Sequence, residues 1–328
     1  MAAPRILLVR LGAMGDILHT LPAAATVRAN LPDAFLAWLV EPRWQPLLSG
    51  HPAVDECIPF DRRQWRQLPS RLAALRARRF DLAIDFQGLL KSALPARMSG
   101  AAQVAGYARE AAREPWAAWF YTRVCQPRAA HIVDRHLELA VMASGPKRVV
   151  RFDVPPGREE APLPERFVLA SPLAGWGSKQ WPLERYADLA TLLREQFAMP
   201  LVLNGAPSQA ETLRAVPGVT VHITGLDGLI DATRRASAVV GLDSGPLHLA
   251  AALSKPGVAL FGPTDPARNG PYCGTITVLR DASSRTSYRR TSETESGMAA
   301  LGAGRVMEIL SGVLRQSPAA GPLPRATA

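Results

Sequence analysis

The turn Asp243-Ser244-Gly245-Pro246, with His248 just behind it, is the part of this sequence that points most directly to chemistry. An apolar, β-branched run ends at Asp243, and an apolar helix that carries His248 is predicted to begin after the turn. The first backbone N–H groups of a helix lack intrahelical partners and lie at the positive end of its dipole, so such a turn suits an anion such as a diphosphate. Gly245 has no side chain to hold a phosphate away. Because Asp and Ser are also common capping residues, Asp243 and Ser244 could instead serve only to cap the helix.

A second turn of this kind, Gly12 to Asp16 (GAMGD), follows an apolar run near the N-terminus. It has two glycines, Gly12 and Gly15, rather than the three of a dinucleotide fingerprint, so we do not expect a nicotinamide cofactor. A carboxylate at this position can act as a general base if an acceptor hydroxyl reaches it. Asp16 could equally be a simple helix cap.

Two other loops carry residues suited to hydroxyls or phosphates. Lys179 follows a strand-like run through small residues and is one of only four lysines beside 34 arginines. A compact point charge suits a phosphate or a leaving group, although an ordinary surface position is the alternative. In the segment DFQGLLK, Asp85 and Gln87 could bind hydroxyls and Lys91 a phosphate, or they could serve only the turn.

Further candidates lie where a nucleoside is expected. Gly205 ends a strand-like run before a helix with Glu211, which could bind ribose hydroxyls, while Gly225 and Leu226 end the following run and could lie beside a base. In FGPTDP, Asp265 could bind substrate or only cap a helix. Each of these signals is weak when taken singly.

The elements that must hold these residues alternate between strands and helices. This alternation predicts a parallel sheet in each half of the chain, with ligands at the carboxyl ends of the strands and an active site in the cleft between the halves. The Pro-rich segment 154–164 has the composition of a linker, so we expect domains at 1–155 and 156–328. Segments 282–297 and 316–328 are expected to be mobile, with a helix over 298–314. The expected strands are Arg5 to Arg10, Phe35 to Glu41, Phe80 to Phe86, Gln103 to Tyr107, Phe167 to Ser171, Leu201 to Asn204, Val219 to Ile223, Ala238 to Leu242 and Val258 to Phe261.

Length and composition agree with two globular domains. A chain of 328 residues, 48% of them hydrophobic, suits two medium cores better than one. Its three cysteines form no CxxC pair, which argues against a disulfide framework and a zinc site and favours the cytoplasm. No apolar run approaches the roughly 20 residues that a membrane span needs. Arg10 and Asp16 interrupt the first 24 residues, so we expect no signal peptide.

The basic charge is concentrated in the first half. Residues 1–155 hold 21 Lys and Arg against 13 Asp and Glu, a net +8, whereas residues 156–328 hold 17 against 15. Such a field favours an anionic partner: nucleic acid, a phospholipid surface or a phosphorylated substrate. Arg62, Arg63 and Arg66 crowd about Trp65, and a solvated helix face is the alternative for the arginines that follow them.

Together and in this order, several segments resemble the bacterial lipopolysaccharide heptosyltransferases of glycosyltransferase family 9. The resemblance runs from Ile6 to about Tyr272, is closer to the first enzyme type of that pathway than to the second, and is carried by MGDILHTLPA, DFQGLLKSAL, REPWAAWFY, SKQWP, DSGPLHLAAAL and FGPTDP. It implies an α/β GT-B fold of two Rossmann-like domains whose parallel sheets face each other across a cleft. The N-terminal domain would bind the acceptor and the C-terminal domain the ADP-sugar donor.

The resemblance also implies a reaction and its residues. L-glycero-D-manno-heptose would move from ADP-heptose to the Kdo sugar of Kdo-lipid A with inversion, Asp16 acting as base and Lys179 offsetting charge on the departing ADP. The other donor-binding residues would be Gly205, Glu211, Gly225, Leu226, Asp243, Ser244, Gly245, Pro246 and His248. The acceptor-binding residues would be Gly15, Asp16, Arg62, Arg63, Arg66, Gln87, Lys91 and Arg113. Where some relatives have hydroxyl residues ahead of the lysine, this chain has Ala174 and Gly175, so donor contacts there would come from backbone N–H groups.

Cofactor, partners and location follow from the same resemblance. We expect no cofactor beyond the donor and no metal, because a helix N-terminus and a lysine can neutralise a diphosphate and no DxD-type acidic pair stands where a divalent ion would be needed. The enzyme would be a cytoplasmic monomer, peripheral on the inner face of the inner membrane, with no nucleic-acid partner. The alternatives are a related transferase or epimerase using another nucleotide-sugar, and a basic protein that binds nucleic acid or membrane. Few aromatics, at 6%, speak against a stacking surface for nucleic acid.

Overall fold

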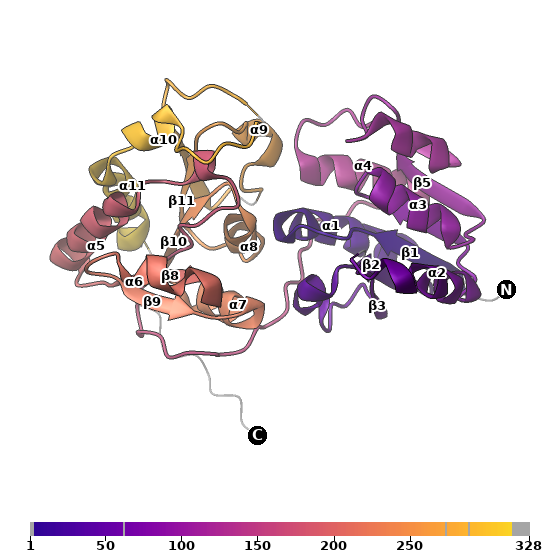
Figure 1. Ribbon diagram of the computed structural model, residues 1–328, viewed down its shortest axis with the longest axis horizontal. Coiled ribbons are helices and arrows are strands. Elements are labelled where there is room, and N and C mark those ends of the chain that lie inside the picture. Colours follow the sequence, from indigo (N-terminus) through magenta and orange to yellow (C-terminus); the bar gives the residue numbers. More distant parts are fainter. Residues whose placement is uncertain (1–2, 62, 273, 288, 317–328) are drawn as a thin grey trace. The chain divides into compact units, whose positions relative to one another are not determined.

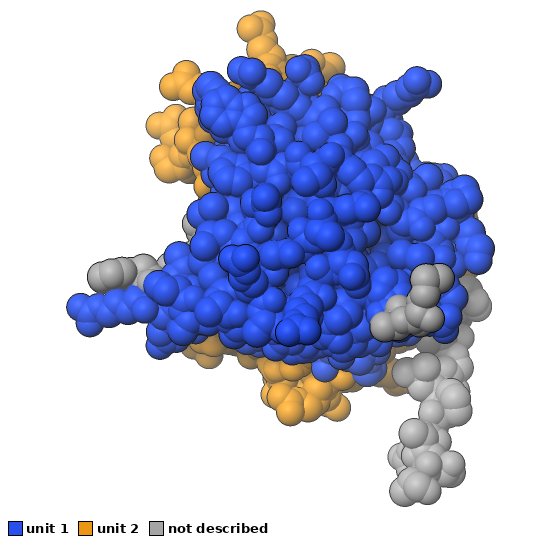
Figure 2. All heavy atoms as spheres, turned by 90° about the vertical axis from the view of Figure 1, so that its right-hand side faces the viewer, with its two compact units in different colours: residues 1–156 blue, residues 157–328 orange. Residues whose placement is uncertain are grey.

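The computed structural model describes residues 3–61, 63–272, 274–287 and 289–316 of the chain (Figure 1). The chain divides into two compact units, residues 1–156 (unit 1) and residues 157–328 (unit 2), which Figure 2 shows in separate colours. Each unit contains its own six-stranded sheet, and every strand pair in both sheets is parallel. The predicted α/β class with two parallel sheets is therefore confirmed.

Unit 1 has the strand order β3-β2-β1-β4-β5-β6. Its strands are β1 (Arg5–Val9), β2 (Phe35–Val40), β3 (Glu56–Pro59), β4 (Leu82–Asp85), β5 (Gln103–Tyr107) and β6 (Arg123–Cys125). Its helices are α1 (Met14–Asn30), α2 (Leu68–Ala77), α3 (Leu90–Met98) and α4 (Ile132–Ser144), with the 3₁₀ turns η1 (Pro42–Leu48), η2 (Trp65–Gln67) and η3 (Pro115–Phe120). The chain order reverses between β1 and β4, and in open parallel sheets such a switch point is where ligands bind, outside the carboxyl ends of the strands.

The core of unit 1 follows from the alternation of side chains along its strands. Leu7 and Val9 of β1 pack in one buried cluster with Leu72 and Leu75 of α2 and Ala96 of α3. The opposite face is covered by α1 and α4, which pack against each other. Both faces of the sheet are thus buried, which explains why β1 and β2 are continuous apolar runs.

Unit 2 has the strand order β12-β11-β10-β7-β8-β9. Its strands are β7 (Val168–Ala170), β8 (Leu201–Gly205), β9 (Thr220–Ile223), β10 (Ala238–Leu242), β11 (Gly257–Phe261) and β12 (Ile276–Arg280). Its helices are α5 (Leu183–Phe197), α6 (Ala210–Arg214), α7 (Leu226–Arg235), α8 (Gly245–Ala252), α9 (Pro266–Asn269), α10 (Ser296–Ala300) and α11 (Ala303–Gln316), with the 3₁₀ turns η4 (Gly177–Lys179) and η5 (Pro207–Gln209). Here the switch point lies between β10 and β7.

In unit 2, helices α5 and α11 cover one face of the sheet and α8 covers the other (Figure 1). Val240 of β10 points into the cluster with α5 and α11, whereas Gly241 faces α8. A Cβ at Gly241 would lie 2.7 Å from the Leu247 side chain, so glycine allows the close approach of α8 to its strand. The strand and the helix that carry Asp243 and His248 are therefore fixed to each other by packing.

Some sequence expectations were wrong in detail. The expected strands are present within two residues at each end, but the edge strands β3, β6 and β12 were not anticipated. The helix expected over 298–314 is instead two helices, α10 and α11, interrupted at Leu301-Gly302. Of the segment expected to be mobile at 316–328, all but Gln316 lies outside the described residues. Within the described part of the chain, no helix has both the length and the apolar character needed to cross a bilayer.

Candidate functional site

In unit 1, Asp16 lies in the first turn of α1, directly beyond the carboxyl end of β1. Its Oδ1 forms an ion pair with Arg10 Nη2 at 2.8 Å, and its Oδ2 accepts the Ala13 backbone N–H at 3.3 Å. The Arg10 side chain is almost fully buried and also donates to the Phe86 carbonyl at 2.6 Å, whereas Asp16 is 32% exposed. A buried cation thus orients a carboxylate that solvent, or an incoming hydroxyl, can still reach.

The loop after β4 holds the loop between β1 and Asp16 in place. Gln87 is buried, and its Oε1 accepts the Leu11 N–H at 2.9 Å, which ties the two loops together. Asp85 is fully buried, and its oxygens accept from the Gln87 N–H, Ser92 Oγ and Tyr121 Oη at 2.7 to 2.8 Å. Burial raises the pKa of the Asp85 carboxyl, against the lowering effect of these hydrogen bonds. Both oxygens of Asp85 accept hydrogen bonds from within unit 1, so Asp85 holds the loop. Of the two roles that the sequence allowed, the structure therefore favours the role in the turn over the binding of an acceptor hydroxyl.

A third loop, after β5, brings Arg113 to the same place. Arg113 Nη1 lies 4.0 Å from Asp16 Oδ2, and the arginine side chain is 55% exposed. The Glu114 N–H donates to the Gly88 carbonyl, and the Glu114 carboxylate accepts the Leu90 N–H, so this loop is fastened to the start of α3. Gly88 has φ +65, a conformation that favours glycine, and it lies where the loop after β4 comes close to the backbone of Arg113.

The remaining acceptor candidates differ in position. Gly15 immediately precedes Asp16, and Lys91 lies in the first turn of α3, which follows the Gln87 loop. Arg63 and Arg66 are exposed and follow β3, two strands away from β1, or roughly 10 Å along the sheet edge. Arg62 lies outside the described residues.

In unit 2, Lys179, Asp243 and His248 converge at the carboxyl end of β10. Lys179 Nζ lies 2.6 Å from Asp243 Oδ2, and His248 Nε2 lies 3.4 Å from Asp243 Oδ1. Burial raises the pKa of Asp243, but hydrogen bonds and charge from His248 and Lys179 more than offset it and hold that pKa well below its usual range. Asp243 is therefore ionised, and its side chain binds neighbouring side chains rather than capping the helix.

The turn after Asp243 begins α8 as predicted. Ser244 is the N-cap by position, but its side chain makes no capping hydrogen bond, and Gly245 and Pro246 form the first turn. The first-turn N–H groups therefore have no partner supplied by the Ser244 side chain, and they remain suited to an anion. Of the two alternatives left open by the sequence, capping by the Asp243 and Ser244 side chains does not occur, and anion binding stays a prediction.

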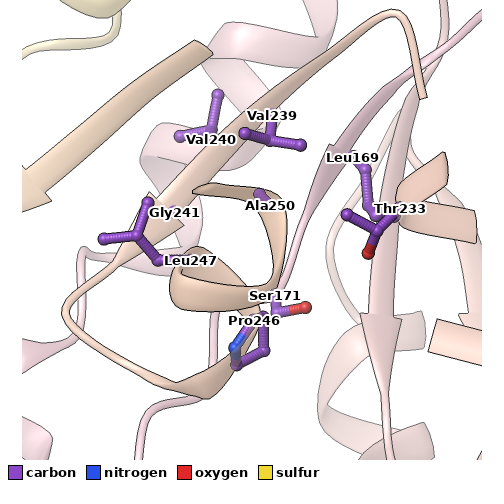
Figure 3. Close-up of a pocket in the computed structure, with 9 residues that line it drawn as sticks. All are labelled: Leu169, Ser171, Thr233, Val239, Val240, Gly241, Pro246, Leu247 and Ala250. Atoms are coloured by element: carbon purple, nitrogen blue, oxygen red, sulfur yellow. The ribbon is translucent and has the colours of Figure 1, made fainter. Parts of the chain in front are cut away.

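A small pocket lies behind this turn, between the sheet and helices α7 and α8 (Figure 3). It is mostly apolar, with Ser171 and Thr233 as its polar residues, and the Thr233 hydroxyl already donates to the Leu229 carbonyl at 2.7 Å. The lining residues are Leu169, Ser171, Thr233, Val239, Val240, Gly241, Pro246, Leu247 and Ala250. None of the three converging side chains lines it, so this pocket is a packing gap beside the candidate site.

Sequence reasoning missed a strap that crosses this part of unit 2. The strap, the described part of residues 281–295 between β12 and α10, falls largely in the segment 282–297 that was expected to be mobile. Instead the Ser178 N–H donates to the Thr291 carbonyl at 3.2 Å, and the Ser287 N–H donates to the Pro263 carbonyl at 2.7 Å. The strap therefore joins the loop after β7 to the loop after β11, on either side of β10.

The strap also brings a second cation to the lysine. Lys179 Nζ lies 4.3 Å from the centre of the Trp176 ring, and the Arg290 guanidinium carbon lies 5.2 Å from the same centre. Both distances are within the range of cation–π attraction. Trp176 and Arg290 are far apart in the sequence, and no local pattern connects them.

Two buried hydroxyls were missed as well. Ser178 Oγ and Thr264 Oγ1 are buried, and neither has a hydrogen-bond partner among the described residues. Ser178 lies in η4, after β7, and Thr264 follows β11, so they flank the β10 end that carries Asp243. An unsatisfied buried hydroxyl costs stability, so a polar group that completes it, from water or a ligand, would be favourable.

The nucleoside-side candidates follow β8 and β9. Glu211 is exposed in α6, and Gly205 ends β8 where a Cβ would lie 2.5 Å from Leu213, so Gly205 has a packing role. The Gly225 N–H, at the N-cap of α7 just before Leu226, donates to the Glu160 carboxylate at 2.5 Å. The first turn of α7 is thus already bound by an anionic group. Within the described ranges, no cluster of three or more His, Cys, Asp or Glu residues is arranged to hold a metal ion.

Comparison with known proteins agrees with this geometry. The family model for "Glycosyltransferase family 9 (heptosyltransferase)" matches residues 70–298. Lipopolysaccharide heptosyltransferase 1 of Pseudomonas aeruginosa is 34% identical over 296 residues, which are 82% of this chain and 81% of that protein. Lipopolysaccharide heptosyltransferase 1 of Escherichia coli strain K12 is 30% identical over 295 residues, which are 82% of this chain and 91% of that protein.

Solved structures show the same fold. The E. coli heptosyltransferase WaaC with ADP matches with a TM-score of 0.77 and 28% identity, over 94% of this chain and 99% of that chain. The E. coli ADP-heptose lps heptosyltransferase II matches with a TM-score of 0.78 and 24% identity, over 95% of this chain and 99% of that chain. The GT-B architecture predicted from the sequence is confirmed by these neighbours.

Proposed function

This chain belongs to glycosyltransferase family 9 and is a heptosyltransferase of lipopolysaccharide core biosynthesis, and from that premise we propose how its two units divide one reaction. Unit 2 binds ADP-heptose and unit 1 binds the acceptor, the Kdo sugar of Kdo-lipid A. The observation that carries the donor assignment is the cluster of Lys179, Asp243 and His248 at the N-terminus of α8. The relative solved with ADP supports the nucleotide.

The proposed chemistry is a single inverting displacement. The acceptor hydroxyl loses its proton to Asp16 as its oxygen bonds to the anomeric carbon of the heptose. The bond from that carbon to the diphosphate breaks, and its electron pair leaves with ADP. Arg10 keeps the Asp16 carboxylate oriented throughout, because the ion pair fixes one oxygen and leaves the carboxylate partly exposed.

Groups of the chain itself stabilise the negative charge on the departing ADP. Lys179 supplies a point charge and the first turn of α8 supplies backbone N–H groups, so the proposed reaction needs no metal ion. Arg290, which shares the Trp176 ring with Lys179, adds a second cation at this edge. Asp243 is placed to accept a hydrogen bond from a heptose hydroxyl, since it is ionised and follows β10 directly.

On the acceptor side, Arg113, Lys91, Arg63 and Arg66 follow the carboxyl ends of strands in unit 1, where phosphates and the Kdo carboxylate would be bound. Because the acceptor is anchored in a membrane by lipid A, we propose that the enzyme acts at the cytoplasmic face of the inner membrane. We also propose that it acts as a monomer. Nucleic acid is not a partner in this scheme.

The direct test is transfer with purified substrates. Incubation with ADP-heptose and Kdo-lipid A should add the mass of one heptose to the acceptor, as measured by mass spectrometry, with no added metal and in the presence of a chelator. In parallel, ADP should raise the melting temperature more than UDP or GDP, because a ligand that binds only the folded state stabilises it. Transfer only from another nucleotide-sugar, or a strict requirement for a divalent ion, would contradict the proposal.

A further inference from the structure

Large exposed hydrophobic side chains gather on one part of unit 1. Leu90, Leu94 and Met98 of α3 are each 40% to 43% exposed, and Trp116 and Trp119 of η3 are 48% and 70% exposed. Outside this group, the described residues include three further exposed large hydrophobics, namely Val124, Val150 and Val278. A contiguous exposed apolar surface on a folded protein often marks an interaction site.

The five side chains belong to neighbouring elements. Residues four apart lie on one face of a helix, so Leu90, Leu94 and Met98 form a stripe about 12 Å long on the outer side of α3. The inner side of α3 is buried through Ala93 and Ala96. Helix α3, which carries the stripe, packs against η3. In η3 the Trp116 and Trp119 rings meet edge to face, 4.7 Å apart.

The charge around this apolar surface is positive. Residues 90–128 hold six Lys and Arg and two Asp and Glu. Arg97 is exposed beside Met98, and the Arg109 guanidinium stacks over Trp116 at 5.3 Å. Of the two acids, Glu110 is exposed and Glu114 already accepts the Leu90 N–H. Apolar and aromatic side chains flanked by two arginines match the interface of an anionic bilayer, where tryptophan is enriched and each basic residue adds attraction.

We propose that this surface, Leu90, Leu94, Met98, Trp116 and Trp119 with Arg97 and Arg109, docks unit 1 on an anionic lipid bilayer. The inference rests on the proposed function for its purpose, because it sets the lipid-anchored acceptor beside the base. Leu90 begins the helix that follows the Gln87 loop, and Arg113, three residues before Trp116, lies 4.0 Å from Asp16 Oδ2. Docking here holds the acceptor sugar near Asp16 while its lipid stays in the bilayer.

The test is vesicle binding by the full chain, with phosphatidylcholine vesicles alone or mixed with phosphatidylglycerol. The wild-type protein should sediment with the mixed vesicles, less so as salt is added. The double variant Leu94→Ser with Trp119→Ser should lower the partition coefficient by about tenfold or more. The reason is that the variant loses the free energy gained when these two apolar side chains move from water into the bilayer. Val278→Ser, an exposed apolar position in unit 2, is the matched control and should bind as wild type.

Activity separates this inference from the proposed function. The double variant should transfer heptose to a water-soluble Kdo glycoside at the wild-type rate, and should lose activity only on Kdo-lipid A in vesicles. If the double variant binds vesicles as tightly as wild type, or if loss of binding is matched by a change from dimer to monomer, the docking surface is wrong. Vesicle binding without transfer to either acceptor would instead contradict the proposed function and leave the surface supported.

Discussion

The Asp16 carboxylate takes its orientation from Arg10, whose side chain is almost fully buried. One guanidinium nitrogen of Arg10 reaches the Phe86 carbonyl, and another reaches Asp16 Oδ1. A change at Asp16 therefore has two separate effects, one on proton transfer and one on the hydrogen bonds that the carboxylate accepts from Arg10 and Ala13. A test of the base assignment has to keep the second effect small.

Asp16→Asn meets that requirement, because the amide oxygen can still accept from Arg10 or Ala13. It should lower the rate of transfer by about a hundredfold or more, as expected for loss of a general base, and leave ADP affinity unchanged. Steady-state kinetics and calorimetric titration with ADP give the two numbers. Wild-type turnover by the Asn variant would exclude Asp16 as the base.

At the donor cluster, Asp243 and Lys179 should respond to substitution in opposite ways. Lys179→Met should weaken ADP binding by about tenfold or more, since a buried carboxylate is left next to the phosphates. Asp243→Asn should bind ADP as tightly as wild type or more tightly, because it removes a negative charge and releases Lys179, yet it should lose transfer. Titration with ADP measures both; weaker ADP binding by Asp243→Asn would contradict this arrangement.

At the scale of single elements, α4 carries a titratable group that couples unit 1 to pH. His136 is fully buried against Phe86 and Tyr107, and its Nδ1 is hydrogen-bonded to the Tyr107 hydroxyl. Burial first, and then the positive charges of Arg10 and Arg135, hold the pKa of His136 well below its ordinary value. The folded state therefore keeps this imidazole neutral at pH values where the unfolded chain protonates it.

Stability should accordingly fall as pH decreases below about 6.5, and should be insensitive to this group above that value. The slope approaches about 1.4 kcal/mol per pH unit for one such group, because the unfolded state binds the extra proton. His136→Gln should remove that part of the slope even if it lowers stability overall, as measured by urea unfolding at several pH values. His51 and His222, whose pKa values are also lowered by burial, account for slope that remains. An unchanged slope in His136→Gln would show that His136 titrates normally.

The elements themselves were predictable to different degrees. The central strands, such as β1 and β10, are continuous apolar runs because helices cover both faces of their sheets, and this pattern is visible in the sequence. The edge strands β3 and β6 are short and partly exposed, so Glu56 and Arg123 interrupt any apolar run. The break between α10 and α11 at Gly302 was also missed, although a glycine in a helical pattern is a known weak point.

Across the whole molecule, the sequence placed the candidate site residues at strand ends better than it described their contacts. Asp16, Lys179, Asp243 and His248 follow strand ends, and the general rule for parallel sheets was enough to select them. Their partners are a different matter, because Arg10 at Asp16 and Arg290 beside Lys179 are set by tertiary packing. Asp85 shows the limit plainly: it lies in a suitable loop, but the Tyr121 hydroxyl that occupies it comes from 36 residues away.

The strap between β12 and α10 has a consequence for the design of shortened forms of this protein. Its polar composition suggests a tail that could be deleted. However, its Thr291 carbonyl accepts the Ser178 N–H, and its Ser287 N–H donates to the Pro263 carbonyl. Beyond the strap, the Leu301 carbonyl accepts the Trp181 indole N–H at 2.8 Å. A truncation before residue 281 would therefore unfasten the loop that holds Lys179 as well as trim the C-terminus. A shortened form of the protein should therefore keep the strap and helices α10 and α11.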